Sequence, residues 1–390
     1  MQDNIALVLG GGGARAAYQV GVLKALVQCY PRNHSIPFNI ICGTSAGAIN
    51  GTSIATHASC FHLGVRKLDW VWRHMLTRKI YQTSPWLLLR HLIGMGLRGF
   101  QDDQVNTEAP SLFNNDPLRH LLNELIDFGR IDRNIARGAL RAISVDTSSY
   151  NTSSCISFFQ GGDDIDDWQR ARREGLRTQL NTEHLLASAA IPLVFPSIRL
   201  GQHYFGDGSI HQLAPLSSPI HLGANKIMVI NLDSPHKHLG QELPHHPKAA
   251  TLAGHLLDTI FSDTLNSDLE RLQRINATLC HVPESLKDKL PLKPIETLVI
   301  KPSKDLSAIA RNYYPEMPVG VRHMLKLIGI NQESDSSIVS YLLFERGYTR
   351  ELIELGYQDA MARMDELKQF FELDQPLRPL TSVPQARVAS

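Results

Sequence analysis

The sequence predicts an α/β protein in which a mostly parallel central sheet is covered by helices. Two stretches near the N-terminus carry this prediction, because the apolar runs 5–9 and 38–42 each precede a glycine-rich turn and a segment of small residues. Strands of a parallel sheet are buried on both faces and therefore read as continuous apolar runs. Repeated strand–turn–helix units are typical of α/β folds, so we expect three layers.

Periodicity and turn residues predict the remaining elements. In the segment after the first turn, Ala17, Val20 and Leu23 recur close to a 3.6-residue period, which predicts a helix. Two short alternating segments around Gly201-Gln202 predict a hairpin. The expected strands are 5–9, 38–42, 139–146, 156–159, 197–200, 203–205, 227–232 and 297–300. The expected helices follow the two glycine turns and then cover 116–128, 182–190, 249–275, 319–328 and 336–373.

Shifts in composition along the chain predict its organisation. We expect one α/β domain over 1–235, with a Trp/Leu-rich helical insertion at about 68–130. A His/Pro-rich loop follows at 236–248, and a mostly helical C-terminal extension covers 249–373. The tail 374–390 has proline and polar residues without a period, so we expect it to be disordered.

Composition excludes several classes of function. A formal net charge of +1 gives no reason to expect nucleic-acid binding. The five cysteines are scattered without C-x-x-C spacing, which argues against a disulfide framework and a zinc site and fits a reducing compartment. No apolar run approaches the length of a bilayer span, and the first residues lack the features of a signal peptide. We therefore expect a cytoplasmic protein.

The first glycine turn, Gly10 to Gly13, is suited to holding an anion. Gly11, Gly13 and Ala16 fit the dinucleotide pattern G-x-G-x-x-[GA], but this fingerprint also needs an acidic residue about 20 positions later. No Asp or Glu lies between Asn4 and Leu68, so a nucleotide site is disfavoured. Glycine amides before a helix N-terminus can instead bind a smaller anion, such as a tetrahedral oxyanion.

The second turn, Gly43-Thr44-Ser45-Ala46-Gly47, matches G-x-S-x-G. In that motif a serine sits on a strained strand-to-helix turn with its hydroxyl exposed for nucleophilic attack. Gly43 and Gly47 are glycines because side chains there would clash across the turn. The alternative is an ordinary small-residue turn in which Ser45 caps a helix.

A nucleophilic serine needs a base, and the sequence leaves two kinds open. Asp207-Gly208 follows the predicted hairpin, and the glycine allows a sharp turn beside the carboxylate. Histidine is the usual partner of serine in a triad. The candidates that follow Asp207 in the chain are His211, His221, His236 and His238.

Taken together, Gly11-Gly12-Gly13-Ala14-Arg15, Gly43-Thr44-Ser45-Ala46-Gly47 and Asp207-Gly208-Ser209 resemble the patatin-like phospholipase family in order and spacing. The resemblance is to the bacterial type, covers about 5–233, and implies a patatin-like three-layer fold whose first domain is catalytic. It implies a Ser–Asp dyad with Ser45 as nucleophile and Asp207 as base. It also implies an oxyanion hole at Gly11, Gly12 and Gly13, with Arg15 as the basic residue that follows, and a nucleophile elbow flanked by Gly43 and Gly47. Ala16 and Ser209 depart from the family's usual glycine and small residue at those positions.

The resemblance implies a serine hydrolase that cleaves carboxylic esters of phospholipids, lysophospholipids or related acyl lipids. No cofactor or metal is implied, and the expected partner is the lipid substrate. Two other functions remain open from the sequence. One is a soluble carboxylesterase with a Ser–Asp–His triad, and the other is a catalytically silent lipid-binding protein on the same scaffold.

Two further segments could carry function. Trp70, Trp72 and Trp86 lie among leucines and basic residues, which suits peripheral contact with an anionic membrane or, equally, packing in the core. The acidic run 163–167 lacks the spacing of a calcium loop. We expect it to begin a helix near Trp168, where carboxylates are favourable.

Overall fold

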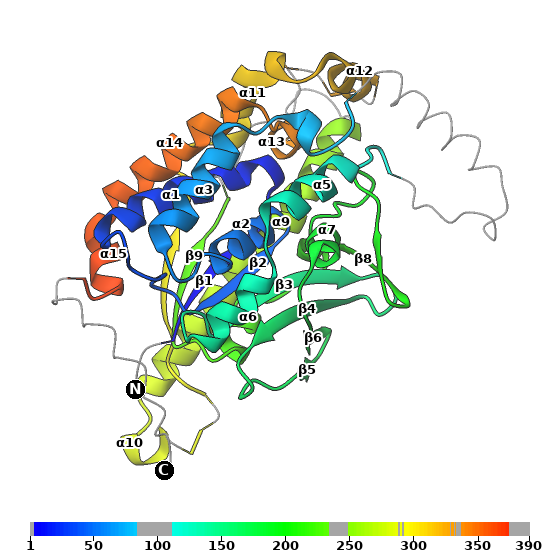
Figure 1. The fold of residues 1–390 in the computed structure, drawn as a ribbon. Coiled ribbons are helices and arrows are strands. Elements are labelled where there is room, and N and C mark those ends of the chain that lie inside the picture. The colour runs from blue at the N-terminus through cyan, green and yellow to red at the C-terminus, as the bar shows by residue number, and fades with distance from the viewer. Residues whose placement is uncertain are drawn as a thin grey trace, which may run out of the picture.

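The computed structural model describes residues 4–83, 111–233 and 249–373, apart from 288, 291, 328, 331 and 333–336. Its strands form one sheet in the order β10-β9-β1-β2-β3-β4-β6-β5, and β7 joins through β8, which pairs with β3 (Figure 1). The strands are β1 (Ile5–Leu9), β2 (Ile40–Thr44), β3 (Ala142–Ser149), β4 (Ser154–Gly161), β5 (Trp168–Arg170), β6 (Arg173–Arg177), β7 (Ile198–Leu200), β8 (His203–Asp207), β9 (Lys226–Ile230) and β10 (Glu296–Ile300).

The helices cover both faces of this sheet (Figure 1). They are α1 (Ala17–Leu26), α2 (Ala46–Ala55), α3 (Phe61–Arg73), α5 (Asp116–Leu125), α6 (Gly129–Ala136), α7 (Thr182–Ser188), α8 (Ser217–His221), α9 (Ala249–Cys280), α10 (Glu284–Lys287), α11 (Leu306–Tyr313), α12 (Val319–Leu327), α13 (Ile338–Leu342), α14 (Arg346–Ala362) and α15 (Met364–Phe370). The predicted α/β class, with its helical C-terminal part, is confirmed.

The centre of the sheet is parallel and its far side is mixed. Strands β10, β9, β1, β2 and β3 pair in parallel. Beyond them, β4 runs antiparallel to β3, and the β7–β8 hairpin predicted around Gly201 is present. The predicted strand near residue 297 is β10, which lies parallel to β9 and so places part of the C-terminal region in the same sheet.

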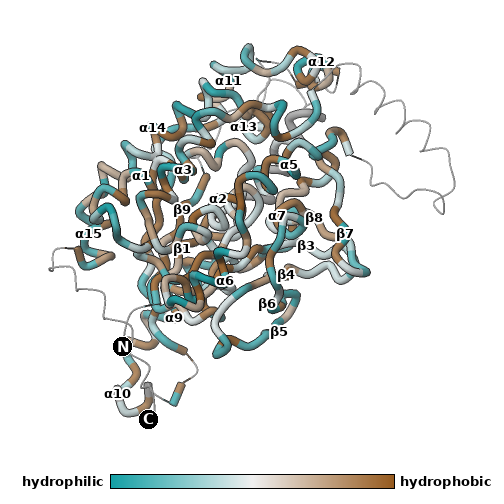
Figure 2. The backbone as a smooth tube through the Cα atoms, in the orientation of Figure 1, coloured by the Kyte–Doolittle hydropathy of each residue, from teal (hydrophilic) through white to brown (hydrophobic). Residues whose placement is uncertain are grey.

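Alternation along β1 shows how the sheet separates two cores. Leu7 and Leu9 belong to a large apolar cluster that includes α1 and α14, whereas Ala6 and Val8 belong to a second cluster. The second cluster contains Leu265 of α9. Successive strand residues point to opposite faces, so β1 is buried from both sides. In Figure 2 the central strands are accordingly hydrophobic, while outer helices such as α15 carry many hydrophilic positions.

Two local predictions differ from the structure. The acidic run does not begin a helix: Trp168 starts β5, where its ring lies 5.0 Å from Phe159 and 5.1 Å from His221, measured between ring centroids. Pairing with Gly175 of β6 leaves room for this ring, because any Cβ on Gly175 would overlap it. The predicted helical stretch 336–373 is divided into α13, α14 and α15. Loop 236–248, tail 374–390 and part of the predicted insertion lie outside the described residues.

Among the described residues, none of the helices combines the length and apolar character that a bilayer crossing requires. The described cysteines are all free thiols.

Helices α1 and α14 pack at backbone distance because each carries a glycine at the contact. A Cβ on Gly21 would lie 2.0 Å from the carbonyl oxygen of Ile353. A Cβ on Gly356 would lie 2.1 Å from the carbonyl oxygen of Tyr18. The C-terminal helix α14 is therefore closely joined to the first helix of the chain.

We predict that Gly21→Ala destabilises the protein by roughly 1–3 kcal/mol, because the helices must move apart. The higher helix propensity of alanine relative to glycine would by itself stabilise α1 by about 1 kcal/mol, so a net loss of stability must come from the contact with α14. Urea unfolding followed by circular dichroism measures the difference. Gly129→Ala is the control, since its Cβ would meet nothing closer than 3.4 Å. Equal stability of Gly21→Ala and the wild type would contradict the close packing.

Candidate active site

Strand β3 brings the ends of two other strands together. β4 pairs with β3 along its whole length, 142–149, so β2 and β8 share the opposite edge. β2 pairs with β3 as far as Asp146, and β8 pairs with it from Thr147 onward. The end of β2 therefore meets the end of β8. Ser45 directly follows β2, and Asp207 is the last residue of β8.

Ser45 occupies a strained turn between β2 and α2. Its φ is 56° and its ψ is −130°, a conformation that residues other than glycine rarely adopt. A Cβ on Gly43 would lie 2.5 Å from the Cα of Ala48, and one on Gly47 would lie 2.2 Å from the carbonyl oxygen of Leu9. The clash at Gly43 is across the turn, as predicted, whereas the clash at Gly47 is with the end of β1 rather than with the turn. The Ser45 side chain makes no capping hydrogen bond to α2, which argues against a helix cap.

Ser188 fixes the backbone of this turn. The N–H of Ser45 donates to the Ser188 hydroxyl at 2.8 Å, and that hydroxyl donates to the carbonyl oxygen of Asp146 at 2.6 Å. Ser188 ends α7, so this hydrogen-bonded chain links α7, the serine turn and β3. Nothing in the local sequence singles out Ser188 for this contact.

Asp207 is a fully buried carboxylate beside Ser45. Its Oδ1 accepts a hydrogen bond from the N–H of Ser209 at 3.0 Å, whereas its Oδ2 has no partner of ordinary geometry among the described residues. Burial raises the pKa of Asp207 to about 6, and interactions with the Ser45 side chain and Ser209 limit the rise. Ser45 thus approaches Asp207 without an ideal hydrogen bond, as is common in sites without substrate.

A second buried carboxylate, Asp146, supports the turn from β3. Its Oδ1 accepts hydrogen bonds from Ser157 at 2.6 Å and Ser218 at 3.2 Å. Its Oδ2 accepts from the side chains of Gln212 and Thr44. Burial also raises the pKa of Asp146 to about 6, and these hydrogen bonds limit the rise. The sequence signal was a lone carboxylate within a predicted strand, and it was not recognised.

The glycine loop lies against the serine turn. A Cβ on Gly47 would come within 2.6 Å of the carbonyl oxygen of Gly10, so the two predicted turns are in contact. Gly11, Gly12 and Gly13 are buried. Gly13 has a φ of 55°, and a Cβ there would lie 2.3 Å from the carbonyl oxygen of Tyr341.

Arg15 points away from Ser45 and into the C-terminal part of the chain. Its guanidinium donates to the hydroxyls of Ser340 at 2.7 Å, Tyr341 at 2.9 Å and Ser307 at 2.8 Å. It also lies 3.9 Å from the centroid of the Tyr341 ring and 3.4 Å from a carboxylate oxygen of Asp258. The Arg15 N–H is bonded within the turn, to the carbonyl oxygen of Gly12. Arg15 therefore fixes the glycine loop to the C-terminal region.

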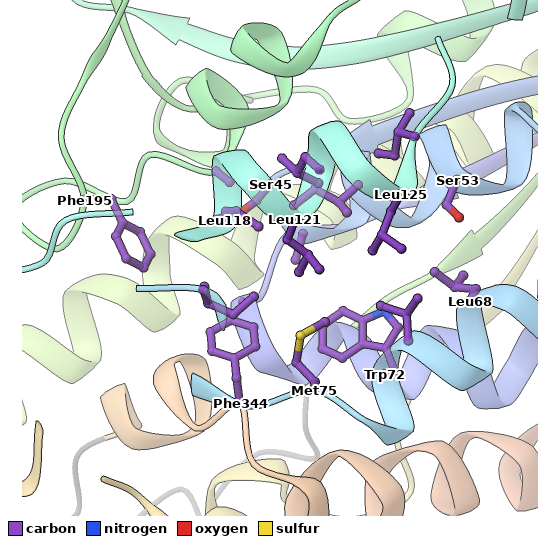
Figure 3. Close-up of a pocket in the computed structure, with 18 of the residues that line it drawn as sticks. Ser45, Ser53, Leu68, Trp72, Met75, Leu118, Leu121, Leu125, Phe195 and Phe344 are labelled. Carbon is purple, nitrogen blue, oxygen red and sulfur yellow. The ribbon is translucent and has the colours of Figure 1, made fainter. Parts of the chain in front are cut away.

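An apolar cavity opens beside Ser45 (Figure 3). The space beside Ser45 amounts to about 820 Å³, a volume that includes the part open to solvent. Its walls come from α2, α3 and α5 and from segments near Phe195 and Phe344. In Figure 3, Phe195 lies on one side of Ser45, and Leu125, Ser53 and Leu68 lie on the other.

The described histidines do not form a triad with the serine. No hydrogen bond of the described residues joins a histidine ring to Ser45 or Asp207. The ring of His221 is stacked on Trp168, on the far side of the sheet from the cavity lining. His211 donates its backbone N–H to Ser148. His236 and His238 lie outside the described residues.

The three tryptophans of the predicted insertion have different surroundings. Trp72 is buried, lines the cavity and donates its indole N–H to Asn50 at 2.8 Å. Of the two predicted roles, membrane contact and core packing, Trp72 therefore has the second. Trp70 is 58% exposed and packs beside His74. Trp86 lies outside the described residues.

Parts of this chain are similar to known proteins. The family model for patatin-like phospholipases matches residues 7–220. The rat patatin-like phospholipase domain-containing protein 7 is 48% identical over 66 residues, which are 17% of this chain and 4% of the relative. A lysophospholipase of Aspergillus terreus, nte1, is 53% identical over 55 residues, 14% of this chain and 3% of the relative. The matches thus span only a small part of these curated relatives.

Two solved structures align with most of this chain, at lower sequence identity than these relatives. Human GIVD cytosolic phospholipase A2 aligns with a TM-score of 0.40 and 11% identity, covering 95% of this chain and 60% of that one. VipD from Legionella pneumophila aligns with a TM-score of 0.36 and 11% identity, covering 94% and 67% of the two chains.

We predict that Asp207→Asn stabilises the protein above pH 6. The native pKa of Asp207 is raised to about 6 from 3.8, so ionisation destabilises the folded wild type as pH rises through this window. The neutral variant avoids this loss of up to about 3 kcal/mol. Urea unfolding of both proteins at pH 4 and pH 8 tests the sign. A variant that is no more stabilised at pH 8 than at pH 4 would contradict the raised pKa.

Proposed function

This chain belongs to the patatin-like phospholipase family, and on that premise we propose that it is a serine hydrolase of acyl lipids. The proposed reaction is cleavage of carboxylic ester bonds in phospholipids, lysophospholipids or related lipids. The observation that carries the proposal is the meeting of Ser45 and Asp207 at the wall of an apolar cavity. A buried nucleophile, a carboxylate with a raised pKa and an apolar cavity together suit ester hydrolysis at a lipid.

In the proposed first step, the Ser45 oxygen attacks the ester carbonyl carbon while Asp207 accepts the hydroxyl proton. The carbonyl oxygen becomes negatively charged in the tetrahedral intermediate. The intermediate then collapses, the bond to the alcohol oxygen breaks, and Asp207 returns its proton to that oxygen. The products of this step are the free alcohol and an ester between Ser45 and the fatty acid.

The second step releases the fatty acid. Water attacks the carbonyl carbon of the acyl-serine while Asp207 accepts a proton from it. The new tetrahedral intermediate expels the Ser45 oxygen, which regains a proton from Asp207. Both steps use the same pair of residues, and the proton balance closes within one turnover.

The raised pKa of Asp207 supports its role as a base. A carboxylate with an ordinary pKa near 4 removes a proton from a hydroxyl poorly. Burial brings the pKa of Asp207 to about 6, which strengthens it as a base yet leaves it largely ionised at neutral pH. The absence of an ordinary partner for its Oδ2 among the described residues leaves an oxygen for the incoming proton.

We assign the oxyanion hole to the backbone amides of Gly11, Gly12 and Gly13. The contact between Gly47 and Gly10 supports this assignment, since it brings the glycine loop beside the serine turn. Arg15 is a positioning residue in this scheme rather than an oxyanion donor. Its buried guanidinium holds the loop to Ser340 and Tyr341. One lost oxyanion donor typically lowers turnover by about 10²–10³.

We propose Trp70 as a contact with an anionic membrane surface. It is exposed on α3, one of the helices that form the cavity wall. Indole rings favour the interface between water and lipid, so this position would bring the cavity close to its substrate.

We predict that wild type hydrolyses medium-chain p-nitrophenyl esters and lysophosphatidylcholine, whereas Ser45→Ala and Asp207→Asn lose at least about 10³ of this activity. Release of nitrophenol and of fatty acid measures the rates, and unfolding curves confirm that both variants are folded. Activity retained by Asp207→Asn would favour a histidine base. If wild type hydrolysed none of these esters and did not react with a fluorophosphonate, a silent lipid-binding protein would be the better description.

We predict that the protein co-floats with anionic liposomes and that Trp70→Ala reduces the bound fraction several-fold, because one indole is removed from the interface. The control must lose an exposed aromatic ring, which rules out Trp168→Phe because the Trp168 ring is stacked on Phe159. Tyr204→Ala removes an aromatic ring that is 44% exposed on β8 and provides a better comparison. Equal flotation of Trp70→Ala and wild type would remove Trp70 from the contact.

A further inference from the structure

The cavity extends from Ser45 along one face of α2. Ser45, Ile49 and Ser53 line it. Ser45 directly precedes α2, and Ile49 and Ser53 are four residues apart within α2, so these two lie on the same side of the helix. Helices rise about 1.5 Å per residue, so Ser53 lies roughly 12 Å beyond Ser45 along the axis, and Ile49 lies about half as far. This arm of the cavity therefore has a definite length.

The sides of this arm are apolar. Leu121 and Leu125 of α5 line one side, and Leu68 and Trp72 of α3 line another (Figure 3). The only polar atom of Trp72 is bonded to Asn50. A hydrocarbon chain in this arm would thus be surrounded by carbon atoms from three helices.

The far end of the arm is polar. Ser53 and Lys67 line the cavity there, and the ammonium of Lys67 donates to the carbonyl oxygen of Leu125 at 2.7 Å. This bond joins α3 to the end of α5. Burying each further methylene is favourable only where the wall is apolar, so the gain from a longer chain should stop at Ser53 and Lys67.

We propose that this arm measures the acyl chain and accommodates about ten carbons of a single chain, with Ser53 and Lys67 as the residues that set the limit. An extended chain advances roughly 1.2 Å per bond, so ten bonds span the distance from Ser45 to Ser53. The proposal rests on the proposed function, since the ester carbonyl must lie at Ser45. It adds the preferred chain length, which the family assignment does not supply.

The test is a profile of kcat/KM against chain length. p-Nitrophenyl esters from four to sixteen carbons are compared as monomers in one fixed mixture of water and a miscible cosolvent without detergent, so that each chain is transferred to the protein from solution rather than from a micelle. For wild type, kcat/KM is expected to rise about fourfold for each added CH₂ and to level off near ten carbons. A rise that continues to sixteen carbons would overturn the proposal.

Three variants then shift the limit in known directions. Ile49→Phe fills the arm halfway, so the rise should end near five carbons. Ser53→Phe fills the far end, so kcat/KM should stop rising at a chain length between the five carbons of Ile49→Phe and the ten carbons of wild type. Lys67→Met replaces the ammonium with an apolar chain, so the rise should continue past ten carbons. The Lys67 substitution adds no bulk to the core, which keeps the test valid if a phenylalanine variant does not fold.

Leu63→Phe is the matched control. Leu63 is exposed on α3 and is not part of the cavity lining, so the added ring should leave the profile unchanged. A damaged protein would lower kcat/KM for all chain lengths equally, whereas the proposed limit changes the shape of the profile. Profiles that coincide for wild type and all three variants would overturn the proposal while leaving hydrolysis intact. Absence of any hydrolysis, with Ser45 unreactive toward a fluorophosphonate, would instead overturn the proposed function and this limit with it.

Discussion

The proposed site depends on the two edges of β3. Because β4 occupies one edge throughout, β2 and β8 must share the other, and they meet end to end between Asp146 and Thr147. This register brings Ser45 and Asp207 together although the loops and helices between them are long. A slip of one residue would reverse the faces of all side chains in a strand. The sheet therefore supplies the precision that a two-residue catalytic pair requires.

The two buried carboxylates show how the same pKa can serve different purposes. Asp146 accepts hydrogen bonds through both oxygens, from Ser157 and Ser218 on one and from Thr44 and Gln212 on the other. Asp207 has one oxygen without an ordinary partner among the described residues. A carboxylate with saturated hydrogen bonds holds its neighbours in place, whereas one with spare capacity can accept a proton. The local destabilisation at Asp207 is the kind of strain that functional sites retain.

Local motifs predicted the parts of the site that short segments encode. The turns around Ser45 and Gly13 were recognisable, since glycine is needed where another backbone passes within contact distance. The hydroxyl partners of Arg15 were not, because Ser307, Ser340 and Tyr341 lie more than 290 residues later and are joined to it only by the fold. The expected helix at Trp168 failed for a related reason. Favourable carboxylates before a helix are worth little against strand pairing and ring stacking with distant residues.

The hydrogen bonds that join Arg15 to the C-terminal region also have a consequence for biosynthesis. Ser340 is made 325 residues after Arg15, so the glycine loop lacks these partners until most of the chain has been translated. At about 5–20 residues per second, this interval is roughly 16–65 s. A nascent chain would therefore carry its serine turn long before the loop beside it is held in place. The proposed oxyanion hole would thus be held in its final position only after Ser45 and Asp207 have both been made.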